Sequence, residues 1–237
     1  MVWGRVRAAE CKGLKDPSNL TDDRALDFLK EAIARCRICR DAPFGGEARR
    51  LPHEPNPVCV PSTTARIAIC GQAPGTRVHK SGVPFTDPSG DRLRHWLGID
   101  SETFYDDSRI AIIPMGFCFP GLDAKGGDLP PRRECRATWH DQVFAAMPQL
   151  DLILAVGLHA QSYHLPEAKG RSLTETVADW RAVSRSNSRT VTVYPLPHPS
   201  WRNNSWLKRN PWFEAELLPD LRARVRARLN GSTRTAS

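Results

Sequence analysis

The sequence has no apolar run of the length that a membrane-spanning helix requires, which is about 20 residues. Its first eight residues, MVWGRVRA, also lack the apolar region of a secretory signal peptide. These two absences predict a soluble, cytoplasmic protein without a membrane partner. The sequence also lacks an internal repeat.

The sequence has fewer acidic than basic residues: it contains 26 Asp and Glu and 34 Lys and Arg, which gives a formal net charge of +8 and a pI near 9.4. This balance favours a polyanionic partner. The 237 residues suffice for one α/β domain whose core needs no disulfide. We expect residues 1–20 to form an N-terminal extension, residues 21–230 a single domain that acts as a monomer, and residues 231–237 a disordered tail.

Short apolar segments alternate with segments of helical pattern along the chain. The apolar segments, which predict strands, are 66–70, 109–115, 150–156 and 190–196. The helical segments are 22–36, 91–97, 135–147 and 212–229. Residues 45–64 are rich in Pro, Gly and charge, and predict a long surface loop. The alternation predicts an α/β fold with a parallel sheet that is covered on both faces.

Two polar turns directly follow two of the predicted strands. The turn after the first strand, called motif A here, is Gly71, Gln72, Ala73, Pro74 and Gly75. The turn after the fourth strand, motif B, is His198, Pro199 and Ser200. Ligands of parallel α/β sheets bind at the carboxyl ends of strands, and small turn residues let backbone amides approach a ligand closely. We therefore expect motifs A and B to form one pocket.

The seven cysteines predict a metal site more readily than disulfides, because the expected compartment is reducing. Four of them follow the order CxxC, then C, then C: Cys36, Cys39, Cys118 and Cys135. Four thiolates can hold an iron–sulfur cluster or a zinc ion. Cys11, Cys59 and Cys70 fall outside the pattern, and we expect Cys70 to be buried in its strand.

Motif A, the segment GVPFTDPSG at residues 82–90, motif B and the cysteine quartet together resemble the uracil-DNA glycosylase superfamily. The resemblance covers about residues 30–215 and is closest to the iron–sulfur, thermophile-type branches. It implies a three-layer α/β/α fold with a four-stranded parallel sheet. It also implies a structural 4Fe-4S cluster on the four cysteines, with zinc as the alternative occupant.

The implied activity is DNA repair by a monofunctional glycosylase. Such an enzyme flips uracil or another deaminated base out of DNA, hydrolyses the N-glycosidic bond and leaves an abasic site. By resemblance, Gln72 contacts the base through its backbone, Phe85 stacks on it, and His198 donates a hydrogen bond to the base oxygen that gains charge. Asp87 would orient the attacking water; alternatively, it only begins the turn before a helix whose N-cap is Ser89 or Asp91.

Two positions depart from the superfamily pattern. Ala73 stands where the best-known branch has its water-orienting aspartate, which moves that role to Asp87. Pro114 stands where uracil-specific relatives have an asparagine, and proline has no side-chain donor or acceptor. We therefore expect a broadened base specificity that extends to hypoxanthine or xanthine. The departures leave a second hypothesis open, a catalytically inactive iron–sulfur protein that recognises damaged or single-stranded DNA.

The segment after motif B mixes aromatic, amide and basic side chains. In the superfamily this loop enters the minor groove and contacts flanking phosphates, which requires both stacking and charge neutralisation. The resemblance makes Ser200 a phosphate ligand, and Trp201, Arg202 and Asn203 DNA-contacting residues. An ordinary basic surface loop is the alternative. The arginines of residues 212–229 predict a solvated face, with DNA contact as the alternative.

Overall fold

The computed structural model describes residues 22–185 and 191–231. Four parallel strands form one sheet in the order β2-β1-β3-β4: β1 (Ile67–Cys70), β2 (Ile110–Ile112), β3 (Leu152–Val156) and β4 (Thr192–Leu196). Each strand lies inside the segment predicted for it. The predicted four-stranded parallel sheet is therefore confirmed.

Side-chain size differs between the two faces of the sheet. On β1, Ile67 and Ile69 point into one core, whereas Ala68 and Cys70 point into the other. Ala111 and Ala155 continue the row of small side chains on the second face. Both faces exclude water, as a parallel sheet requires, and the small residues let helices pack close to the second face.

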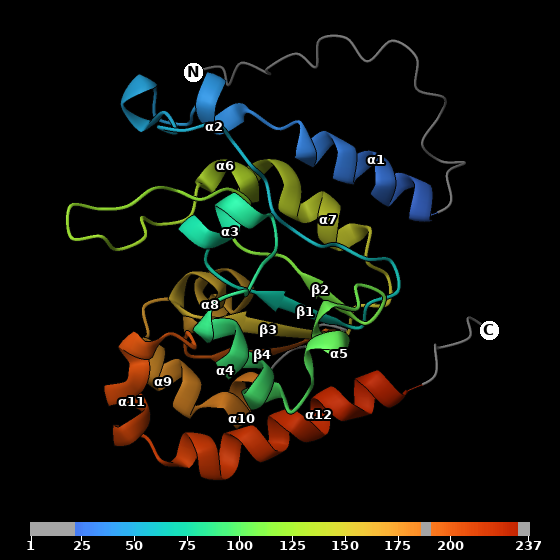
Figure 1. The fold of residues 1–237 in the computed structure, drawn as a ribbon. Coiled ribbons are helices and arrows are strands. Elements are labelled where there is room, and N and C mark those ends of the chain that lie inside the picture. The colour runs from blue at the N-terminus through green and yellow to red at the C-terminus, as the bar shows by residue number, and fades with distance from the viewer. Residues whose placement is uncertain (1–21, 186–190, 232–237) are drawn as a thin grey trace.

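Helices cover both faces, which gives the predicted three layers (Figure 1). The face of the sheet that contains Ile67 and Ile69 is called the isoleucine face here. The layer over it contains α4 (Pro88–Leu97), α5 (Ser101–Tyr105), α9 (Leu173–Ala178), α10 (Trp180–Val183), η6 (Phe213–Leu217) and α12 (Leu218–Asn230). The opposite layer contains α1 (Asp22–Ala34), α6 (Arg133–Cys135), η3 (Arg136–His140), α7 (Asp141–Ala145) and α8 (Leu158–His164). The remaining helical segments are α2 (Ile38–Asp41), η2 (Glu47–Arg49), α3 (Thr76–Ser81), η4 (Pro166–Ala168), η5 (Trp201–Asn203) and α11 (Asn204–Arg209).

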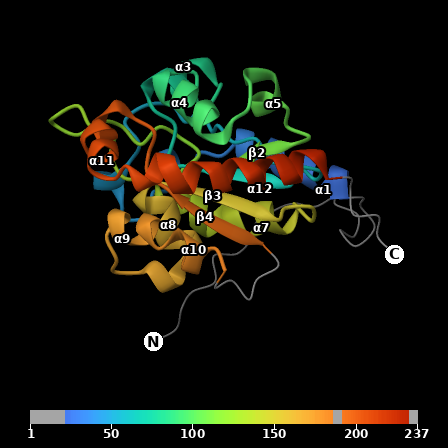
Figure 2. The same cartoon turned by 90° about the horizontal axis from the view of Figure 1, so that it is seen from below.

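Helix α12 crosses the sheet on the isoleucine side, as the view from below shows (Figure 2). Its predicted apolar stripe is confirmed, because Leu221 and Val225 are fully buried. Arg222 donates to the backbone oxygens of His95 and Trp96, and Arg228 pairs with Asp151. These arginines are therefore occupied in holding the helix to the protein.

The prediction of a surface loop over residues 45–64 was wrong for its second half. Val58 and Ser62 are buried, and Val60 forms an antiparallel bridge with Ile112 through hydrogen bonds of 2.8 and 3.0 Å. The bridge satisfies backbone groups at the outer edge of β2, which a short edge strand would otherwise leave unpaired. The sequence does not predict this pairing, because prolines lie close to Val60 and are disfavoured in strands.

The predicted N-terminal extension, residues 1–20, lies outside the described residues, as does the predicted tail except Gly231. Within the described part of the chain, every helix is too short or too polar to cross a membrane.

Candidate active site

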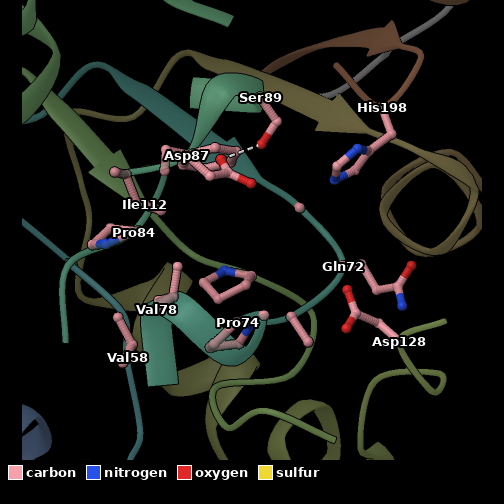
Figure 3. A pocket seen from close by; sticks show the side chains of 15 residues that line it. Val58, Gln72, Pro74, Val78, Pro84, Asp87, Ser89, Ile112, Asp128 and His198 are labelled. Carbon is pink, nitrogen blue, oxygen red and sulfur yellow. Dashed lines mark hydrogen bonds between the residues drawn. The ribbon is translucent and has the colours of Figure 1, made fainter. Parts of the chain in front are cut away.

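A cavity of about 110 Å³ opens at the carboxyl edge of the sheet (Figure 3). Its lining includes motif A, Phe85, Asp87, Pro114 and His198. These residues come from segments far apart in the sequence, and the parallel strands bring them to one edge. The other lining residues are Val58, Val78, Pro84, Ser89, Ile112 and Asp128.

Motif A is fixed by the loop that follows β2. The backbone oxygens of Gly71 and Gln72 accept hydrogen bonds from the amides of Met115 and Gly116, each at 2.9 Å. A Cβ on Gly71 would lie 3.8 Å from the ring of Phe85. Motif A therefore forms a rigid wall of the cavity beneath an aromatic ring.

Phe85 has a left-handed backbone, with φ of 55°, which a bulky residue rarely adopts. Its carbonyl accepts a hydrogen bond from the hydroxyl of Tyr105 at 3.1 Å, and its ring packs edge-to-face on Phe104. A Cβ at Gly90 would lie only 1.9 Å from the same carbonyl oxygen, so this position requires glycine. The surrounding contacts hold Phe85 in a strained conformation that places its ring at the cavity.

Asp87 is the N-cap of α4, and the prediction that Ser89 or Asp91 caps this helix was wrong. Its Oδ1 accepts hydrogen bonds from the amide of Gly90 at 3.3 Å and from the hydroxyl of Ser89 at 2.5 Å. Within residues 22–185 and 191–231, Oδ2 has no hydrogen-bond or ion-pair partner. Asp87 therefore begins a helix with one oxygen and has the other available for a ligand of the cavity (Figure 3).

The ring of His198 is held in one tautomer. Its Nδ1 accepts a hydrogen bond from the backbone amide of Ser200 at 3.2 Å, so the proton of the neutral ring resides on Nε2. Burial lowers the pKa of His198 below its ordinary value, and the charges of Asp87 and Asp128 oppose that effect. The side chain of Asn203 donates to the carbonyl of His198 at 2.7 Å and fixes the turn. His198 thus presents a neutral N–H donor at the cavity.

Motif B continues into a loop with one large exposed aromatic residue. Trp201 is 73% exposed, and the guanidinium of Arg202 lies 6.0 Å from the centre of its ring. Ser200 is half-buried, and its carbonyl accepts a hydrogen bond from Arg92. The side-chain amide of Asn203 already donates to the carbonyl of His198 within motif B, whereas Trp201 and Arg202 are exposed to solvent.

Asp128 was not identified from the sequence, although it lines the cavity. It lies in the irregular connection between β2 and α6, where side-chain periodicity carries no information. The available signal was Gly126-Gly127 directly before it, because this pair marks a turn that can expose the next side chain.

Three of the four predicted metal ligands are buried, and all four border a second, smaller cavity. The other lining residues are Pro55, Pro57, Phe117 and Trp139, so the donors are sulfur atoms in apolar surroundings. The indole N–H of Trp139 donates to the sulfur of Cys36 at 3.4 Å, and the amide of Phe117 donates to the sulfur of Cys135 at 3.3 Å. Hydrogen bonds of this kind stabilise thiolates that bind iron.

The cysteine quartet fits a metal cofactor in donor chemistry. Contact with Cys135 lowers the pKa of Cys39, while burial raises the pKa of Cys118. Bound metal would reverse the latter effect, because it holds the thiol in its deprotonated form. In the side-chain positions of the described ranges, no group of three or more His, Cys, Asp or Glu residues is arranged around a metal position. A cofactor at this quartet stays a proposal.

Two of the other three cysteines, Cys59 and Cys70, serve packing. Cys70 is fully buried in β1, as expected, and burial raises the pKa of its thiol. Burial also raises the pKa of Cys59. Cys11 lies outside the described residues.

A parallel α/β sheet with a carboxylate, a neutral imidazole donor and an aromatic ring around a cavity at its carboxyl edge has the groups that suit a small planar ligand. The model of the uracil DNA glycosylase superfamily matches residues 59–222. The chain belongs to this superfamily, which indicates DNA glycosylase chemistry and DNA as the substrate. Both motifs and the second cysteine pair lie in the matched region, whereas Cys36 and Cys39 precede it.

Proposed function

We propose that the protein is a monofunctional DNA glycosylase that removes uracil or another deaminated base and leaves an abasic site. The observation that carries this proposal is the single cavity shared by motif A, Phe85, Asp87 and His198. A base inside a duplex cannot reach such a cavity, so the nucleotide must be flipped out of the stack.

In the proposed mechanism, the flipped base stacks on Phe85 and contacts the backbone of Gln72. Stacking on an aromatic ring contributes about 1 to 3 kcal/mol, which offsets part of the unstacking cost. As the bond between the sugar and the base breaks, electrons move onto the base, and an oxygen of the base accepts a hydrogen bond from Nε2 of His198. A neutral donor suffices, because the developing charge strengthens the bond in the transition state.

Water completes the hydrolysis at C1′ of the sugar. We assign the orientation of this water to Asp87, whose Oδ2 has no partner among the described residues. The negative carboxylate also stabilises the positive charge that develops on the sugar. Because Ala73 lacks a polar side chain and the side-chain amide of Gln72 is bonded to the carbonyl of Leu129, motif A takes part through its backbone alone.

DNA binding is proposed for the loop after motif B. Trp201 offers an aromatic surface of the kind that stacks on exposed bases, and Arg202 offers a cation for a phosphate. Ser200 is placed between His198 and this loop, which suits a ligand of the phosphate next to the flipped nucleotide. The proposed role of Asn203 is to hold the turn through the carbonyl of His198.

We further propose that Cys36, Cys39, Cys118 and Cys135 bind a 4Fe-4S cluster, with zinc as the alternative. The cluster would be structural: it would tie the start of the chain to the connection after β2 and to α6. Metal analysis and the optical spectrum of the purified protein test this assignment. Iron with thiolate-to-iron charge-transfer absorption supports the cluster, zinc without colour supports the alternative, and metal-free folded protein contradicts both.

The activity is tested by incubating the protein with oligonucleotides that contain uracil, hypoxanthine or xanthine, followed by alkaline cleavage of abasic sites. We expect cleavage after alkali with at least one of them. Salt-sensitive DNA binding without excision of any of these bases would instead favour the inactive DNA-binding protein, because both hypotheses predict binding.

A further inference from the structure

Asp128 is held at the rim of the cavity by a tightly bonded hairpin. Oδ1 of Asp123 accepts hydrogen bonds from the amides of Lys125 and Gly127, both at 2.8 Å. The amide of Leu129 donates to the carbonyl of Gly121 at 3.0 Å and closes the hairpin. The position of Asp128 is therefore determined by backbone bonding on both sides of it.

The hairpin is also fastened to motif A. The side chain of Gln72 donates to the carbonyl of Leu129 at 3.0 Å. Oδ2 of Asp128 lies 3.9 Å from the point where a side chain on Gly75 would begin. Figure 3 shows the carboxylate of Asp128 beside Gln72, on a different side of the cavity from Asp87.

The carboxylate of Asp128 has no hydrogen-bond or ion-pair partner within the described parts of the chain. The residue is exposed at the rim, yet partial burial of the carboxylate raises its pKa, an effect that the charge of Arg202 opposes. A base that filled the cavity would remove water from this group. An acceptor that loses water needs a donor from the ligand, or binding is penalised.

Deamination supplies such a donor. It converts the N3 acceptor of cytosine into the N3–H of uracil, and the N1 acceptor of adenine into the N1–H of hypoxanthine. An ionised carboxylate has acceptors only, so it attracts these ring N–H groups and repels the ring-nitrogen lone pairs of cytosine and adenine. Pro114, the lining residue at the end of β2, has no side-chain group for this task.

We infer that Asp128 distinguishes uracil and hypoxanthine from the cytosine and adenine that they derive from, by accepting a hydrogen bond from the ring N–H that deamination creates. This inference rests on the proposed glycosylase function. It assigns discrimination to the hairpin between β2 and α6, while Asp87 and His198 carry out the reaction. The substrate class is a base on which deamination has created a ring N–H at the edge that faces Asp128, which includes uracil and hypoxanthine.

The test compares single-turnover excision of uracil and of 3-methyluracil from otherwise identical oligonucleotides. The methyl group replaces the N3–H, so the ratio of the two rates measures how strongly the protein uses that hydrogen. In Asp128→Ala we expect uracil excision to fall about 10- to 100-fold, with little change for 3-methyluracil. Asp128→Asn keeps one acceptor and should recover most of the uracil rate.

Asp107→Ala is the matched control, because it removes an exposed carboxylate before β2, at the opposite end of the strands. Equal loss on both substrates in Asp128→Ala, with unchanged thermal stability, would overturn the inference, as would unchanged rates on both. If the wild-type protein excises none of uracil, hypoxanthine and xanthine, the proposed function itself fails. Active wild type with an insensitive Asp128→Ala contradicts the specificity role alone.

Discussion

His198 provides the strongest single perturbation of the proposed chemistry. The substitution His198→Ala removes the neutral Nε2–H donor from the cavity and the Nδ1 acceptor of the Ser200 amide, but it leaves the hydrogen bond from Asn203 to the backbone carbonyl of residue 198 in place. The turn should therefore keep its shape while the transition state loses one donor.

The expected magnitude follows from the role of that donor. Removing one preorganised donor to a developing anion costs about 3 to 4 kcal/mol, which corresponds to a decrease of about 10²- to 10³-fold in the excision rate. Ground-state DNA binding should change far less, because the base oxygen carries little charge before the bond breaks.

Single-turnover kinetics with enzyme in excess isolate the chemical step, and the thermal midpoint reports on folding. His95→Ala is the matched control, because His95 is an exposed histidine near the C-terminal end of α4. A decrease of less than about 10-fold in His198→Ala, with normal folding, would refute the assigned role.

The pH dependence gives an independent check on the same residue. Because burial lowers the pKa of His198 below 6.5, the neutral ring is the majority form at every pH above that value. Titration of His198 should therefore change the wild-type rate by less than about two-fold from pH 6.5 upward. A loss of activity with rising pH in this range that disappears in His198→Ala would show that the charged ring is the active form.

Three further predictions concern the residues around the cavity. Asp87→Asn keeps an N-cap acceptor, so stability should change by less than about 1 kcal/mol in denaturant titrations while single-turnover excision falls about 10²-fold or more; equal activity would exclude the assigned role. Gly90→Ala should displace the Phe85 carbonyl and lower both thermal stability and excision, and normal values of both would contradict the clash. Burial lowers the pKa of His140 to about 4 from its ordinary value of 6.5. The unfolded chain therefore binds the proton first, and the free energy of unfolding should fall by about 3 kcal/mol as the pH drops from 6.5 to 4. His140→Phe should flatten this pH profile in denaturant titrations, and an unchanged slope would contradict the prediction.

The sheet and the convergence of motifs A and B were predictable from the sequence for a physical reason. Continuous apolar runs such as Leu152–Val156 are typical of strands buried on both faces, and parallel strands bring their carboxyl ends to one edge. The positions of the polar turns in the sequence, each directly after a strand, therefore predict where the cavity lies.

Features that depend on tertiary contacts were not predictable in the same way. The bridge of Val60 to β2 depends on an edge that exists only after the sheet has formed. Capping of α4 by Asp87 depends on the conformation of the turn after Phe85. The sequence offers three polar residues near the start of this helix, Asp87, Ser89 and Asp91, and it does not show which of them is the N-cap. Asp128 reaches the cavity through a hairpin that is anchored to motif A by Gln72, and no local pattern reports that contact.

The central claim, that this cavity hydrolyses the bond between a base and its sugar in DNA, is tested most directly by product analysis in water labelled with heavy oxygen. Mass spectrometry should detect the free base and an unbroken strand whose abasic sugar carries one labelled oxygen, and Asp87→Asn and His198→Ala should strongly reduce both products. Folded wild-type protein that releases no base from DNA containing uracil, hypoxanthine or xanthine would contradict the account.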